Sequence, residues 1–289
     1  MTDATFESDA PPATAGRGRE RLVGAAATVA FAATTALALS TGRAKLAGIS
    51  LVAFVAMAAA GWVGGRAPRT HAGTLVWGYG LAAGAMITSA AVFLLPQAMG
   101  QSTVFGGFGV ALGLLVGYGS HTLGHRLAHM ELPLDRSLAE LTAHALSAGA
   151  IIGIVYGNMP ELGPLLGLAI VSHKGPAGYA AAHRFVGRGG EWTAILLPAA
   201  GVGLAAVASS FLALPASAAV RGVVFGFATG VFLHVAMDFL PECEIGSEVH
   251  ESLAREGDAH ALLDRLRVHA VVSTAVGGVA VFLAWTVVG

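Results

Sequence analysis

Nine apolar runs, each about 20 residues long, constrain this chain more than any other feature of its sequence. A helix needs about 20 apolar residues to cross the hydrocarbon core of a bilayer. Only 11% of the 289 residues are charged and the mean hydropathy is +0.71, whereas soluble domains carry about 25% charged residues. We therefore predict an all-α, polytopic membrane helix bundle. The predicted spans are 22–41, 46–65, 74–96, 104–125, 137–157, 161–185, 191–213, 217–240 and 268–288.

The N-terminal segment 1–20 is polar and rich in Ala, Pro and Gly, which predicts a disordered cytoplasmic tail. Residues 21–289 are predicted to form a single transmembrane domain. The run 22–41 follows three arginines and must be compared with a signal peptide, but its apolar core is longer than the usual 7 to 15 residues or so. We interpret it as a retained helix. The single cysteine, Cys243, excludes disulfide frameworks and CxxC metal motifs.

Lysine and arginine predict the topology, because they gather in cytoplasmic loops. If the N-terminus is cytoplasmic, twelve basic residues fall inside and only Arg43, Lys45 and Arg221 fall outside. We therefore expect a multi-pass protein of the cell membrane, with its N-terminus cytoplasmic, its C-terminus outside, and lipid as a partner. The net charge of −1 gives no indication of nucleic-acid binding. The predicted cytoplasmic loop 242–267 is acidic, which favours a solvated amphipathic helix and leaves a weak metal-accepting surface as the alternative.

Two segments of the chain resemble each other. Residues 84–96 and 230–241 are both apolar, both begin with glycine, and both finish in Leu-Pro. We predict that each proline ends its helix and that the similarity reflects an internal repeat, which is common in secondary transporters.

His144, His173 and Lys174 lie inside apolar spans, where polar side chains are costly and by default mark a substrate pathway. A lysine at the membrane centre costs about 2.5 to 3.5 kcal/mol on insertion scales. Pro176 predicts a kink, since it removes a backbone hydrogen bond, and freed carbonyls are tolerated where they line a cavity. Ser147 lies three residues after His144 and hence on the same helix face.

These segments resemble the ZIP (Zrt/Irt-like) family of divalent-metal transporters. That family carries His-x-x-x-Asp-Gly on its fourth helix and His-Glu-x-Pro-x-Gly on its fifth, and this chain has His144…Ala148-Gly149 and His173-Lys174-Gly175-Pro176-Ala177-Gly178. Residues 230–242 are similar to the seventh family helix and residues 93–97 to the second. The resemblance implies a bundle of eight helices over 46–289, with 22–41 as an extra N-terminal helix.

The departures from the family pattern concern its metal centre. The resemblance implies carboxylates at the positions of Ala148, Lys174 and Ala177. Removing one carboxylate from about 5 Å of a dication costs roughly 7 kcal/mol of attraction at an effective dielectric of about 20. We therefore expect the two-metal centre to be lost, leaving His144 and His173 as ligands of one ion such as zinc. Lys174 either occupies the vacated second site as a tethered cation or takes part in proton coupling.

Other polar residues mark further parts of a pathway. His121, His125 and His129 repeat every four residues near the cytoplasmic end of the fourth span, where they form either an accessory metal site or a solvated face. His234, Asp238 and Glu242 follow one another at one-turn spacing and form either an exit path or a helix-packing pair. Glu140, one turn before His144, either replaces a missing carboxylate or caps its helix together with Ser137.

The predicted function is transport of divalent metal cations, most simply zinc, through a histidine-lined intramembrane site. Zinc is then the substrate, and no cofactor is expected. The alternative is a ZIP-like protein that has lost the two-metal site and carries or senses another solute. We do not expect an enzyme, because no Gly-x-Ser-x-Gly elbow surrounds Ser147. A homodimer is left open.

Overall fold

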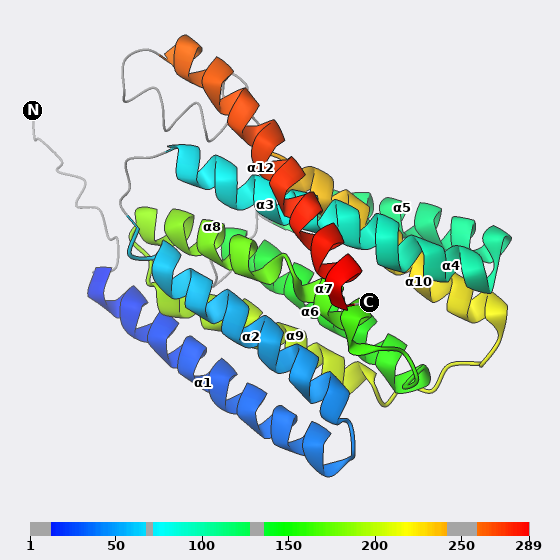
Figure 1. Cartoon of the computed structure of the whole chain (residues 1–289). Helices are drawn as coiled ribbons and strands as arrows, with labels where there is room; N and C mark the ends of the chain where they lie inside the picture. The colour runs from blue at the N-terminus through cyan, green and yellow to red at the C-terminus, as the bar shows by residue number, and fades with distance from the viewer. Residues whose placement is uncertain (1–12, 68–71, 128–135, 242–258, 289) are drawn as a thin grey trace, which may run out of the picture.

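The computed structural model describes residues 13–67, 72–127, 136–241 and 259–288, and in these ranges the regular structure is helical without strands. The helices pack side by side as a bundle (Figure 1). They are α1 (Ala13–Ser40), α2 (Ala44–Gly64), α3 (Ala72–Ser89), α4 (Leu95–Gln101), α5 (Thr103–Leu127), α6 (Arg136–Asn158), α7 (Pro164–Val171), α8 (Lys174–Gly187), α9 (Leu196–Ser209), α10 (Ala218–Asp238) and α12 (Ala259–Val288), with a π-helical turn η1 (Ala90–Leu94) and a 3₁₀ turn η2 (Trp192–Ile195).

Seven helices of the described residues are long and apolar enough to cross a membrane, so the prediction of an all-α, multi-pass membrane bundle is confirmed at that level. Two of the nine predicted spans are not among these seven. The span 104–125 corresponds to α5, which is apolar over Thr103–Gly119, the part of this helix whose side chains the structure describes. The span 161–185 is divided into the short helices α7 and α8.

The helices extend beyond three of the predicted span boundaries. α1 begins at Ala13, within residues 1–20, and α12 begins at Ala259, within the acidic segment 242–267, for which a solvated amphipathic helix was the favoured interpretation. The third span does not end at Pro96, because the helix continues through η1 into α4, where proline occupies the first turn. Proline is tolerated there since it lacks only an N–H that a first turn does not use. The helix at 230–241 does end before its proline, at Asp238.

Small residues bring four pairs of helices into close parallel contact. A Cβ on Gly113 of α5 would lie 2.9 Å from the backbone nitrogen of Val231 in α10, and one on Gly226 would lie 2.9 Å from that of Val110. Glycines pack in the same way at α3 against α12, α6 against α9, and α2 against α8. In lipid, the hydrophobic effect does not drive helices together. Small residues favour helix packing there because they let the backbones approach closely and make van der Waals contact.

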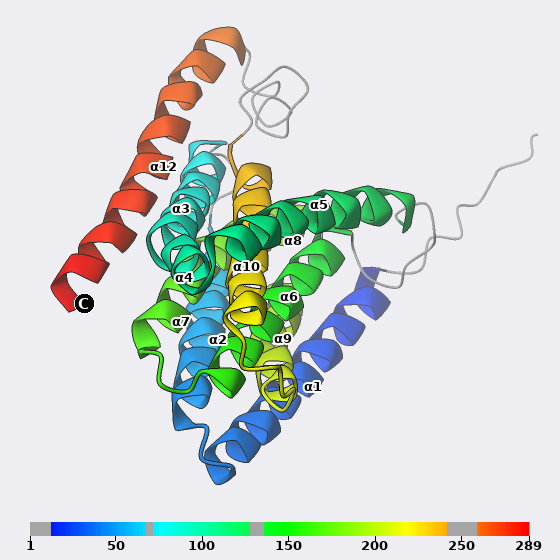
Figure 2. The ribbon, with the colours of Figure 1, turned by 90° about the vertical axis from the view of Figure 1, so that its right-hand side faces the viewer.

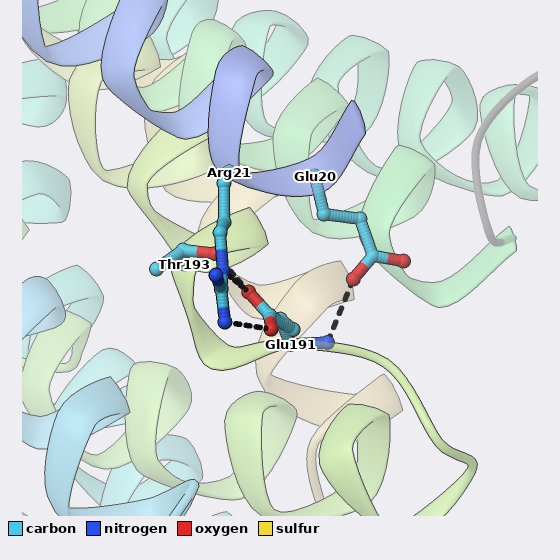
Figure 3. A network of polar contacts seen from close by, with 4 residues as sticks. All are labelled: Glu20, Arg21, Glu191 and Thr193. Carbon is cyan, nitrogen blue, oxygen red and sulfur yellow. Dashed lines mark hydrogen bonds and ion pairs between the residues drawn. The ribbon is translucent and has the colours of Figure 1, made fainter. Parts of the chain in front are cut away.

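α1 packs along α9 and is joined to the bundle by a polar network at its N-terminal end (Figure 3). Arg21 donates to both carboxylate oxygens of Glu191 from Nε and Nη2, each at 2.6 Å. The carboxylate of Glu20 accepts from the backbone N–H of Glu191 at 2.7 Å. Close by, Gly24 lies against the carbonyl of Thr193. The extra N-terminal helix is therefore attached to the segment that leads into α9.

α1 and α12 lie on opposite flanks of the bundle in both views (Figures 1 and 2). α12 runs parallel to α3, since Trp77 and His269 meet near the start of both helices and Phe93 meets Trp285 near their ends. Arg21 of α1 lies beside Glu191, which follows the end of α8. The core between these flanks contains α6, α7, α8 and α10, which carry the polar residues of interest (Figure 2).

Candidate metal centre

The predicted span 161–185 is interrupted at Ser172 and His173, between α7 and α8. Pro176 has no N–H to donate to the carbonyl four residues earlier, so a continuous α-helix loses a hydrogen bond at this point. Just before this point, the carbonyl of Ala169 accepts from the backbone N–H and the hydroxyl of Ser172, at 3.3 and 2.7 Å, and from the hydroxyl of Ser89, on α3, at 2.8 Å. The helical hydrogen-bond ladder is thus interrupted near the predicted kink, although Ser172 and His173 keep right-handed helical backbone angles, and a neighbouring helix donates to a carbonyl beside the interruption.

The break brings the two predicted histidines together. His144 on α6 and His173 at the break face each other, with their Nε2 atoms 3.1 Å apart. One ring must donate and the other accept at this distance, so at least one imidazole is neutral. His173 is completely buried, and the Nδ1 atom of His144 is buried without a hydrogen-bond partner among the described residues. Two residues 29 positions apart in the chain therefore form one centre.

The surroundings of the histidine pair are apolar. Phe232 of α10 packs edge-on against His173, with ring centroids 5.5 Å apart, and Phe239, just after α10, lies 6.3 Å from His144. Ala148 and Ala177 are both about 1% exposed. Two of the three positions at which the family resemblance implies carboxylates are thus buried and filled by methyl groups.

Lys174 directly follows His173 and is the largest fully buried side chain among the described residues. Its Nζ atom has no hydrogen-bond partner among them. It does not snorkel to a membrane surface, because its residue lies between α7 and the rest of α8, near the middle of this broken span. The histidine centre therefore has a buried amine beside it and no acidic side chain that pairs with that amine within the described ranges.

The geometry of the pair is compatible with one zinc ion. Zn–N bonds of about 2.0–2.1 Å at a tetrahedral angle separate two nitrogen ligands by about 3.3 Å, close to the observed 3.1 Å. If the two rings moved slightly apart, a metal ion bound to both Nε2 atoms could replace the hydrogen bond between them. No group of three or more His, Cys, Asp or Glu side chains that could hold a metal occurs in the part of the chain that the structure describes. Two ligands are present, and solvent or solute would have to supply the others.

The remaining predicted pathway residues lie in different environments. The hydroxyl of Ser147 donates to the carbonyl of His144, in its own helix, at 2.9 Å. His234 and Asp238 form an i,i+4 pair on α10 at 3.4 Å, and the ring of His234 packs against Gly117 of α5. This pair therefore belongs to the contact between α5 and α10. Glu140 is exposed in the first turns of α6.

Some predicted residues lie outside the described parts of the chain. Glu242 and His129 are in segments that the structure does not describe. His121 and His125 lie on α5, but their side chains are not described. The accessory histidine site and the end of the exit path stay predictions.

Three residues of the centre were missed from the sequence: Ser89, Phe232 and Phe239. Phe232 and Phe239 are indistinguishable from lipid-facing phenylalanines in an apolar run. Ser89 had a usable signal, because carbonyls near an interrupted helix in a membrane need a hydroxyl or a similar donor, and Ser89 donates to one of them, that of Ala169. Which helix would supply that donor depends on tertiary packing.

Comparison with known proteins adds no relative: no protein-family model matches the chain, and no curated protein matches it significantly.

Proposed function

We propose that this protein is a membrane transporter for divalent cations, most simply zinc, built as a ZIP-like bundle of eight helices with α1 as an extra helix. The observation that carries the proposal is the 3.1 Å approach of the Nε2 atoms of His144 and His173. Neutral imidazole is a good zinc ligand, and this pair lies at a helix break deep in the bundle. Broken helices near the bilayer midplane form the substrate sites of many transporters.

The ZIP-like assignment is supported by the order and spacing of the motifs in the sequence. The distribution of basic residues supports a cytoplasmic side formed by the start of α1, the ends of α2, α8 and α10, and the start of α12. On this topology, His144 and His173 would hold the ion between the outer and inner halves of the membrane. Lys174 beside them would limit the centre to one ion, because an ammonium repels a second dication.

Zinc flux into proteoliposomes tests this function. We expect the wild-type chain to conduct zinc and the double variant His144→Ala/His173→Ala to lose at least about tenfold of that flux, since both protein ligands are removed. His269→Ala is the matched control, because His269 pairs with Trp77 outside the centre and its loss should leave flux unchanged. Zinc flux that is equal in the wild type and the double variant would sink the assignment.

A second function has its own supporting observation. The buried amine of Lys174, which has no hydrogen-bond partner in the described ranges, opposes a dication at the centre, and this favours a protein that carries or senses another solute. Lys174→Glu discriminates between the two functions, because it replaces the ammonium with a carboxylate next to both imidazoles. If the wild type binds no zinc and Lys174→Glu does, as measured by equilibrium dialysis with ⁶⁵Zn, the second function is supported.

A further inference from the structure

A groove between α3 and α12 opens on the outer flank of the bundle. α12 packs chiefly along α3 and stands at the edge of the bundle in Figure 2. The groove has a volume of about 370 Å³, and small-molecule sites in proteins range from about 300 to 1,000 Å³. Gly84 and Gly278 line it where the two helices touch. Ala275, Val279 and Phe282 line its outer side, where Val279 is 55% and Phe282 45% exposed. The groove is therefore open to lipid.

This groove lies at the depth of the bilayer midplane. Two of its lining residues, Thr88 and Thr274, are near the middle of the apolar spans Gly73–Gln101 and Leu262–Val287. The hydrocarbon core of a bilayer is about 30 Å thick, so the ester carbonyls of phospholipids lie at its edges, about 15 Å from the midplane. At the depth of the groove, the phospholipids of the membrane therefore offer only hydrocarbon.

Thr88 places a hydroxyl without a hydrogen-bond partner in the groove. The hydroxyls of Thr229 and Thr274 donate to the carbonyl four residues earlier in their own helices, each at 2.8 Å. Thr88 makes no such bond, and its hydroxyl has no partner within the described ranges. The Oγ1 atom of Thr88 is directed toward α12 instead, since a Cβ on Gly278 would lie 2.7 Å from it. A hydroxyl that finds no acceptor in hydrocarbon is costly, so the groove holds one donor that needs an acceptor from outside the described chain.

We propose that this groove binds a lipid-soluble quinone, one carbonyl of which accepts a hydrogen bond from Thr88. Quinones are uncharged and dissolve in the hydrocarbon core, so they present a carbonyl at a depth that phospholipid carbonyls do not reach. The described residues that line the groove carry no charge, which suits an uncharged ligand. Gly278 has no side chain and leaves room for a flat ring beside the aromatic ring of Phe282. Ser89, the next residue on α3, faces Ala169 of α7 instead, so the quinone site does not depend on the proposed metal transport.

Titration of the full chain in phosphatidylcholine nanodiscs with decylubiquinone tests this site, with protein-free nanodiscs as the background. Infrared difference spectra between quinone with ¹²C and ¹³C carbonyls report the hydrogen bond, because an accepted bond lowers the carbonyl stretching frequency. We expect saturable binding and a lowered carbonyl band with the wild type. Thr88→Val should lose the lowered band and bind about 3- to 20-fold more weakly, as expected for one hydrogen bond in a membrane. Thr88→Ser, which keeps the hydroxyl, should bind like the wild type. Thr34→Val on α1 is the matched control, since the hydroxyl of Thr34 bonds only within its own helix.

Equal binding and the same carbonyl band in the wild type and in Thr88→Val overturn the inference, as does the absence of saturable binding to the wild type. Displacement of the quinone by dodecane, equally from the wild type and from Thr88→Val, shows a site for alkyl chains and overturns it too. Should Thr88→Val not fold, Val279→Trp replaces it, because a larger side chain in the groove should abolish saturable binding. Zinc flux through Thr88→Val should equal that of the wild type, so the quinone site and the transport proposal can fail separately.

Discussion

Ser89 and Lys174 are both fully buried near the histidine pair, but they differ in their hydrogen bonding. The hydroxyl of Ser89 donates across helices to the carbonyl of Ala169, whereas the amine of Lys174 has no partner among the described residues. Sequence reasoning identified Lys174, His144 and His173, because charged and imidazole groups are rare in apolar runs. It could not identify Ser89, because serine is common in membrane helices and only the packing of α3 against α7 gives this one a role.

Removing the Ser89 hydroxyl should destabilise the bundle. We expect Ser89→Ala to lower the free energy of unfolding by about 0.6 to 1.7 kcal/mol, the range of interhelical hydrogen bonds in membranes, because the Ala169 carbonyl loses its partner on α3. Denaturant unfolding in mixed micelles measures the change. Ser40→Ala serves as the control, since the exposed Ser40 hydroxyl bonds only to Leu37 in its own helix. A loss no larger than that of Ser40→Ala would contradict the structural role of Ser89.

Removing the Lys174 amine should stabilise the protein, whereas removing the Ser89 hydroxyl should destabilise it. We expect Lys174→Met to raise the Tm, because an apolar side chain of similar length replaces a buried amine that has no partner among the described residues. A thermal shift assay in detergent checks this. If Lys174→Met unfolds at a lower temperature than the wild type in the same buffer, Lys174 has a stabilising partner within the protein.

At the scale of elements, apolar run length predicted where helices occur but not where they change type. Pro176 correctly indicated an irregularity in the sixth span, whereas Pro96 was wrongly expected to end the third. The difference lies in what precedes each proline: the turn η1 widens the helix before Pro96, while the helical hydrogen-bond ladder is interrupted at Ser172 and His173 before Pro176. A π turn depends on local hydrogen-bond exchange that a hydropathy pattern does not record.

The pairing of helices through glycine gives a sharp test at the same scale. Gly113 has no room for a side chain against Gly230 and Val231, whereas a Cβ on Gly107, six residues earlier on α5, meets nothing within 4 Å. We expect Gly113→Leu to separate α5 from α10 and to abolish a monodisperse peak in size-exclusion chromatography. Gly107→Leu should behave like the wild type. Equal behaviour of the two variants would contradict close packing of α5 against α10.

At the scale of the whole molecule, the start of α1 and the end of α12 lie at opposite ends of the helix bundle. The first is located by the contact of Arg21 with Glu191 and the second by the contact of Trp285 with Phe93. Of the described basic residues, Arg43, Lys45 and Arg221 lie at the ends of α1, α2 and α10 on the same side as the end of α12. This sidedness agrees with the tally of charges made from the sequence. The sequence alone could not say which helices pair, because small residues occur in nearly every span.

The orientation in the membrane follows from the positive-inside rule and is testable with reporters. We expect alkaline phosphatase fused to the C-terminus to be active and green fluorescent protein fused there to be dark, because the distribution of basic residues predicts that the C-terminus lies outside. The same two reporters fused after Arg66, on the predicted cytoplasmic side, should give the reverse result. Fluorescence from the C-terminal fusion would overturn the topology.

The parallel pairing of helices far apart in the chain also has a consequence for biosynthesis. Gly84 of α3 contacts Gly278 of α12. Roughly 190 residues are translated between these two glycines, which takes about 10 to 40 seconds at typical rates, and α3 has no α12 to pack against during this time. During that time its glycine face is open to lipid, to other nascent helices or to an insertion chaperone. The bundle therefore cannot be completed helix by helix as it leaves the ribosome, and its assembly must finish only after α12 has been inserted.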